Sequence, residues 1–179
     1  MTTKYHYEAV ILIHPDFLTD IGQTIEHYKA MLTKDGGIVH RAEDWGKKTL
    51  AYTINDVRKA NYLLFNFEVS VEQQEEFKKY LEFNDAVIRM LVRRIKTAKT
   101  AETAMRVLAK DESSNMRQIA NKYPKDYMNL PWMKANVNET GTIMPARNTE
   151  LSATLQRALS RSVKLARFLS IIPYCDRHS

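Results

Sequence analysis

Cysteine is nearly absent from the sequence, and so are long apolar runs. The 179 residues contain one cysteine, five glycines and five prolines. A single cysteine excludes an internal disulfide framework and is typical of a reducing compartment. Hydrophobic residues make up 44% of the chain, but no apolar run approaches the roughly 20 residues that a membrane-spanning helix needs. We therefore expect a hydrophobic core and no contact with a membrane.

Acidic residues are scarce at the C-terminal end. Residues 141–179 contain six Lys and Arg and only two acidic residues, Glu150 and Asp176. Residues 1–100 are nearly balanced, with fifteen Lys and Arg against fourteen Asp and Glu. A basic segment attached to a nearly neutral body favours a polyanionic partner, most often nucleic acid.

The first hundred residues alternate between strand and helix patterns. Strands are predicted over residues 5–13, 38–45, 60–69 and 86–95, and helices over residues 17–34 and 71–83; residues 50–54 are predicted to be extended too. The order β-α-β-β-α-β is the split, ferredoxin-like arrangement, in which two helices cover one face of a four-stranded antiparallel sheet. The predicted fold class is therefore α+β, with the other sheet face left for solvent, RNA or a partner.

The remainder of the chain is predicted to be a linker followed by a small, mostly helical segment. Residues 97–124 are polar and show no sign of a second core, although residues 101–110 have the composition of a short helix. The predicted organisation is thus a domain over 1–96, a linker over 97–124 and a helical segment over 125–179.

Residues 149–170 predict a helix with two contrasting faces. At about 100° per residue, one face is apolar and the opposite arc is basic. The apolar face comprises Leu155, Leu159, Val163 and Leu169, and the basic arc comprises Arg157, Arg161, Lys164 and Arg167. A basic arc is often only a solvated surface, but no acidic residue occurs between Glu150 and Asp176. We therefore predict that the apolar face docks on protein and that the basic arc binds RNA phosphates.

The sequence does not support any of three catalytic or metal-binding interpretations. Cys175 and His178 have the spacing of half a zinc site, but structural zinc needs four ligands and no second cysteine exists. A catalytic Cys–His pair needs a third, orienting group that the sequence does not supply. Acylphosphatases share the ferredoxin-like fold, but their anion-binding loop needs an arginine that residues 14–16 lack. We predict no enzyme activity, cofactor, metal or small-molecule substrate.

Two stretches of the first domain resemble the bacterial small-subunit ribosomal protein six family. They are "HRAEDWGKKTLAYTINDVRKANYLLFNFEV" (40–69) and "FNDAVIRMLVRR" (83–94), and the likeness covers residues 1–100. The resemblance implies a ferredoxin-like domain that binds ribosomal RNA jointly with small-subunit protein eighteen. It also implies that Lys47 and Lys48 lie close to RNA or that partner; the alternative is an edge strand with solvated lysines.

The C-terminal segment, from about residue 130 to 179, is similar to that partner family. The stretch "ETGTIMPARNTELSATLQRALSRSVKLARFLSIIPYCDRH" (139–178) carries its Gly-x-Ile-x-Pro-x-Arg, Gln-Arg-x-Leu-x-Arg and Pro-Tyr-x-Asp-Arg-His motifs. The resemblance implies that Arg147, Arg177 and His178 contact RNA. The basic, aromatic-containing arm with which members of that family usually begin is absent here.

We interpret the chain as a structural constituent of the small ribosomal subunit that holds both halves of a heterodimer. It would bind the central domain of small-subunit ribosomal RNA, in the platform, beside neighbouring small-subunit proteins. The expected location is a cytoplasmic ribosome, with an organellar ribosome as an alternative. Two other functions remain open at this stage: an RNA-binding regulator of its own messenger, and a protein-interaction module that binds no RNA.

Overall fold

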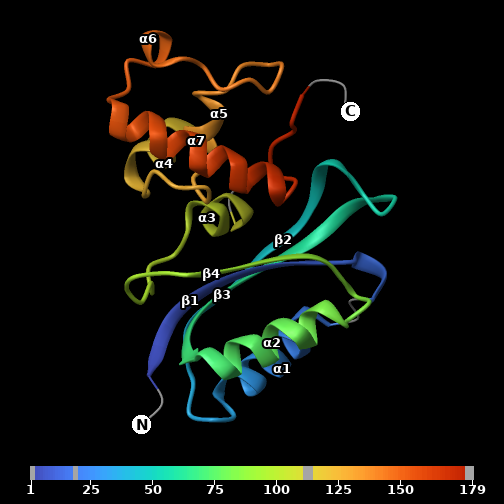
Figure 1. Cartoon of the computed structure of the whole chain (residues 1–179). Coiled ribbons are helices and arrows are strands. Elements are labelled where there is room, and N and C mark those ends of the chain that lie inside the picture. Colours follow the sequence, from blue (N-terminus) through green and yellow to red (C-terminus); the bar gives the residue numbers. More distant parts are fainter. Residues whose placement is uncertain (1–2, 18–19, 111–114, 176–179) are drawn as a thin grey trace. The chain divides into compact units, whose positions relative to one another are not determined.

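The computed structural model describes residues 3–17, 20–110 and 115–175 (Figure 1). The chain divides into two compact units. The first consists of residues 1–49 and 54–101, and the second of residues 50–53 and 102–179. None of the helices in the described ranges is long and apolar enough to span a membrane.

The first unit is a four-stranded antiparallel sheet with two helices. Its elements are β1 (Lys4–Ile13), η1 (Pro15–Phe17), α1 (Ile21–Thr33), β2 (Ile38–Ile54), β3 (Val57–Ser70), α2 (Val71–Glu82) and β4 (Val87–Arg94). The strand order is β2-β3-β1-β4, and the two helices lie on the same side of the sheet (Figure 1). The predicted ferredoxin-like α+β fold is confirmed.

The core of the first unit lies between the sheet and its helices. Alternate residues of β1 and β3 point toward the helices, because successive side chains of a strand face opposite ways. Tyr28 of α1 is 2% exposed and packs edge-on against Phe65 and Phe77. Burial raises the pKa of the Tyr28 hydroxyl to about 12, so this side chain stays neutral and compatible with the apolar core.

Strand β2 is longer than the sequence predicts. Two extended pieces with a break between them were expected, yet one strand runs from Ile38 to Ile54. Gly46 adopts a φ of 78°, and its amide donates a hydrogen bond to Asp44 Oδ1 at 2.7 Å. This local irregularity shifts the register without ending the strand. The hairpin then closes at Asn55 and Asp56, which both have positive φ, as two-residue hairpin turns require.

The second unit is helical. Its helices are α3 (Ala104–Lys110), α4 (Met116–Lys122), α5 (Leu130–Lys134), α6 (Ala146–Thr149) and α7 (Ala153–Phe168). Helix α5 contacts both α4 and α7. Asn129 is fully buried and ties this region together: its amide donates to the carbonyl oxygens of Ala120, Tyr123 and Pro124, while its Oδ1 accepts from the Trp132 amide.

Most of the stretch predicted as a linker is part of this unit. Residues 104–110 and 116–122 are helical, and Ala104, Met105 and Ile119 are buried. These helices have seven residues each, which is too short to be stable alone. They form because a few apolar side chains are buried against the rest of the unit. Such sparse apolar positions leave only a weak periodic signal in a polar sequence.

Candidate nucleic-acid interface

Helix α7 separates an apolar face from a basic one. Ser152 caps its N-terminus by accepting a hydrogen bond from the Leu155 amide. Leu159, Val163 and Ala166 are fully buried, as is Leu169 directly after the helix, whereas Leu155 is half-buried. The spacing of three and four residues places these side chains on one stripe. The predicted apolar face is therefore a packed face of the second unit.

The opposite arc presents three exposed cations, Arg157, Arg161 and Lys164. They are spaced four and three residues apart, so they are neighbours on the helix surface. Within the described ranges, no carboxylate forms an ion pair with any of them. Arg157 Nε donates to the Ala153 carbonyl oxygen at 3.2 Å, which fixes part of the side chain along the helix. Clustered cations of this kind attract phosphates.

Arg167, predicted as a fourth member of this arc, has a different environment. It is half-buried, and its Nη2 donates to the Gly141 carbonyl oxygen at 2.5 Å. Its guanidinium carbon lies 5.6 Å from the centre of the Tyr174 ring. Gly141 itself adopts a φ of 80°, and a side chain there would press on the Pro173 and Tyr174 carbonyl oxygens. Arg167 thus holds the Gly141 loop against the end of α7.

The other predicted contacts of the C-terminal segment are separated from this arc along the chain. Arg147 is exposed on the short helix α6. Arg177 and His178 lie outside the described residues. Of the predicted RNA contacts, Arg157, Arg161 and Lys164 therefore lie together on one face of α7. Arg147 lies on a different helix, α6.

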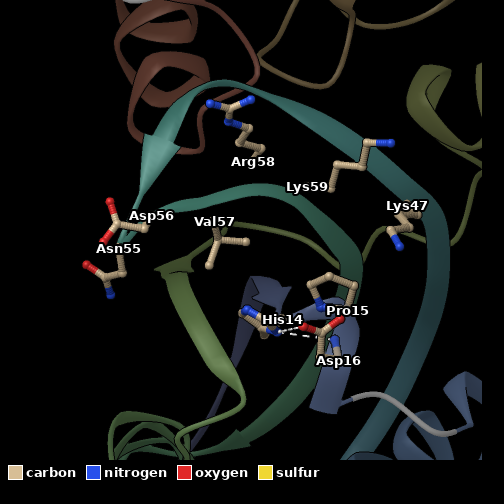
Figure 2. Close-up of a pocket in the computed structure, with 9 residues that line it drawn as sticks. All are labelled: His14, Pro15, Asp16, Lys47, Asn55, Asp56, Val57, Arg58 and Lys59. Carbon is tan, nitrogen blue, oxygen red and sulfur yellow. Dashed lines mark hydrogen bonds and ion pairs between the residues drawn. The ribbon is translucent and has the colours of Figure 1, made fainter.

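Lys47 and Lys48 lie on β2, in the first unit. Lys47 is exposed and lines a pocket that is also formed by the β1–η1 connection and the β2–β3 hairpin (Figure 2). Arg58 and Lys59 line the same pocket, and both are exposed. Asp16 and Asp56 also line it, so the pocket carries both signs of charge. Arg58 and Lys59 are not among the predicted contacts; the two-residue turn at 55–56, which brings the start of β3 back toward Lys47, places them in this pocket.

Four residues of β2, Leu50–Thr53, belong to the second unit and bind the end of α7. The Ala51 amide donates to the Ser170 carbonyl oxygen at 2.8 Å, and the Tyr52 amide donates to Ser170 Oγ at 3.1 Å. Ser170 Oγ donates in turn to the Tyr52 carbonyl oxygen at 2.9 Å. The Tyr52 hydroxyl donates to the Arg167 carbonyl oxygen at 2.7 Å. The sequence gives no signal for this contact, because its partners are 118 residues apart.

Two family models match the chain, each in its own region. Residues 6–94 match the family described as Ribosomal protein S6, and residues 121–172 match the family described as Ribosomal protein S18. The chain joins an S6 region to an S18 region. The two families make it a small-subunit ribosomal protein, and the resemblance found in the sequence to both is confirmed. Among solved structures, the 30S ribosomal protein S6 of Thermotoga maritima is similar at 18% identity, with 52% of this chain and 89% of that chain covered and a TM-score of 0.46.

The hydrogen bonds at Ser170 connect the two regions that match different families. Tyr52 lies within the S6 region and Ser170 within the S18 region. The hydrogen bonds between them therefore join segments that match two different ribosomal protein families. Both segments belong to the same compact unit of this chain.

Proposed function

We propose that the chain binds the central domain of small-subunit ribosomal RNA, in the platform, as a fused equivalent of the S6 and S18 pair. The observation that carries this proposal is the arc formed by Arg157, Arg161 and Lys164. These three cations are exposed on one helix face, while the opposite face is held by buried Leu159 and Val163. A fixed helix whose cations form no ion pair with the described carboxylates can bind a phosphate backbone without having to order itself first.

The contacts of this arc are predominantly electrostatic. Arg157, Arg161 and Lys164 would fix the register of the chain on the RNA backbone, since phosphate contacts carry little sequence information. Arg147, Arg167, Arg177 and His178 complete the proposed contact set of the S18 region, with Lys47 and Lys48 contributed by the S6 region. Arg167 would also act indirectly, by holding the Gly141 loop in place. Selectivity for the central domain would then come from the shape of the RNA.

Docking of the two regions within one chain is part of the proposal. It rests on the hydrogen bonds between Tyr52 and Ser170, while the predicted docking face, Leu155, Leu159, Val163 and Leu169, packs within the second unit. When two binding partners are part of one chain, each meets the other at an effective concentration on the order of millimolar. This holds when the connecting segment is long enough for the two to bind each other. The fused pair would therefore stay assembled at dilutions at which two separate proteins dissociate.

The test is a filter-binding titration of central-domain ribosomal RNA at several salt concentrations. We expect tight binding whose logarithm falls steeply with the logarithm of salt concentration, with a slope of about −3 or steeper for at least three or four phosphate contacts. Random RNA of equal length should bind at least tenfold more weakly. Equal affinity for both RNAs would contradict the proposal and favour non-specific binding. Preference for the chain's own messenger over ribosomal RNA would instead indicate a regulator.

A further inference from the structure

Two histidines and a glutamate converge on three neighbouring strands of the first unit. His6 lies on β1 directly opposite Glu68 on β3. His40 lies on β2, at a register shift between the pairs Val39–Phe67 and Arg41–Asn66. One extra residue at this point is a β-bulge, which re-aims a side chain relative to the regular strand. The bulge is what brings the His40 ring to Glu68.

The nitrogens that face Glu68 have no hydrogen-bond partner among residues 3–17, 20–110 and 115–175. His6 Nδ1 and His40 Nε2 are both buried from solvent and make no hydrogen bond within the described structure. They lie 3.6 Å and 3.4 Å from Glu68 Oε2, beyond the 2.7–3.2 Å of a normal hydrogen bond. A buried nitrogen without a partner is costly, and two of them point at one carboxylate.

These distances match the spacing of ligands around a small tetrahedral ion. The two nitrogens and the carboxylate oxygen all lie within 4.8 Å of one another. An ion bound at about 2.0–2.1 Å from each ligand needs neighbouring ligand atoms roughly 3.3–3.4 Å apart. The two nitrogen-to-oxygen distances are within about 0.3 Å of that value. The two nitrogens lie within 4.8 Å of each other, and their approach to each other would complete the coordination.

We propose that His6, His40 and Glu68 bind a divalent transition-metal ion of the zinc type. Two imidazoles and one carboxylate are a donor set that zinc takes, with the fourth position left for water. Imidazole ligands select against Mg²⁺ and Ca²⁺, which prefer oxygen. The side chains of His6, His40 and Glu68 are 29%, 19% and 27% exposed, so the site lies near the surface, although the two ligand nitrogens themselves are buried. A bound ion would clamp β1, β3 and β2 together.

Other candidate ligands nearby are already engaged. Glu8, two residues along β1, accepts a hydrogen bond from Arg93 Nε at 2.8 Å and pairs with Lys99 at 3.6 Å. Among the described residues, no other group of three His, Cys, Asp or Glu side chains brings its ligand atoms this close. The thiol of Cys175 belongs to the second unit, which makes its removal a suitable control.

The experiment measures Zn²⁺ binding to the full-length, tag-free chain by isothermal titration calorimetry. We expect one Zn²⁺ per chain with a micromolar or lower dissociation constant, and a rise in Tm that EDTA reverses. His40→Gln and Glu68→Gln should each weaken binding at least tenfold. His27→Gln, on α1 and outside the group formed by His6, His40 and Glu68, and Cys175→Ser should leave it unchanged. Circular dichroism checks that each variant is folded.

Two measurements on the unaltered chain keep the test independent of the variants. Co²⁺ should give a tetrahedral visible spectrum without a thiolate charge-transfer band, and Mg²⁺ in tenfold excess should not displace Zn²⁺. The proposal is overturned if the chain binds no Zn²⁺, if His40→Gln binds it as tightly as the unaltered chain, or if binding is lost in Cys175→Ser.

Discussion

Replacing Arg157, Arg161 and Lys164 by glutamate should lower the affinity for central-domain ribosomal RNA by about 10³-fold near 0.1 M salt. Each lost phosphate contact costs on the order of 1 kcal/mol, and each new carboxylate adds a repulsion of at least a few tenths. A total of about 4 kcal/mol corresponds to roughly three powers of ten. The salt slope should also become shallower by about 2–3. Filter binding at four salt concentrations measures both quantities.

The matched control reverses three lysines of the first unit, Lys34, Lys78 and Lys79, which are also exposed. Each reversal replaces a positive charge by a negative one and so lowers the net charge by two. Three reversals therefore take the formal net charge from +6 to 0 in both triple variants. We expect the control to lose less than tenfold in affinity, because no local phosphate contact is removed. An equal loss in both variants would mean that net charge, and not this face of α7, determines binding.

Leu159→Ala should lower the free energy of unfolding of the second unit by about 2–5 kcal/mol. Leu159 is fully buried on the apolar face of α7, so truncation removes its transfer free energy and leaves a cavity. Leu165→Ala, the same change at a half-buried position of the same helix, should cost less. Urea unfolding followed by circular dichroism and tryptophan fluorescence measures this difference, since Trp132 lies in the second unit.

Comparing Leu159→Ala with Leu165→Ala tests whether the apolar face of α7 stabilises the second unit. If Leu159→Ala costs no more than Leu165→Ala, the buried stripe of α7 does not stabilise the unit. At temperatures where the Leu159→Ala variant is still folded, its affinity for RNA should equal that of the unaltered chain. A folded variant with weakened RNA binding would show that the apolar face has a second role.

The elements predicted well are those with strong periodic patterns. The continuous apolar runs of β1 and β3 and the apolar stripe of α7, with its 3.6-residue period, are local signals that can be recognised in the sequence. They were enough to predict the ferredoxin-like fold and the two faces of α7. The exposure of Arg157, Arg161 and Lys164 followed from the same periodicity, because the opposite side of a helix with one buried stripe is left to solvent.

Features that depend on distant partners were not predicted. Helix α4 is short and polar, and it is fixed by burial of a few side chains rather than by its own propensity; a short helix at residues 101–110 was predicted, but not its packing into a second unit. The engagement of Arg167 by the Gly141 carbonyl joins positions 26 residues apart, so periodicity alone assigned it to the exposed arc. The bulge at His40 and the bonds of Tyr52 to Ser170 arise from strand register and tertiary contact. No local pattern encodes them.

The most direct test of the account is hydroxyl-radical footprinting of full-length small-subunit ribosomal RNA with this chain alone. We expect protection only in the central domain. It should saturate at protein concentrations above the dissociation constant measured by filter binding. The protection should disappear with the Arg157, Arg161 and Lys164 reversal and persist with the Lys34, Lys78 and Lys79 reversal. Absence of protection in the central domain, or the same protection with both variants, would contradict the account.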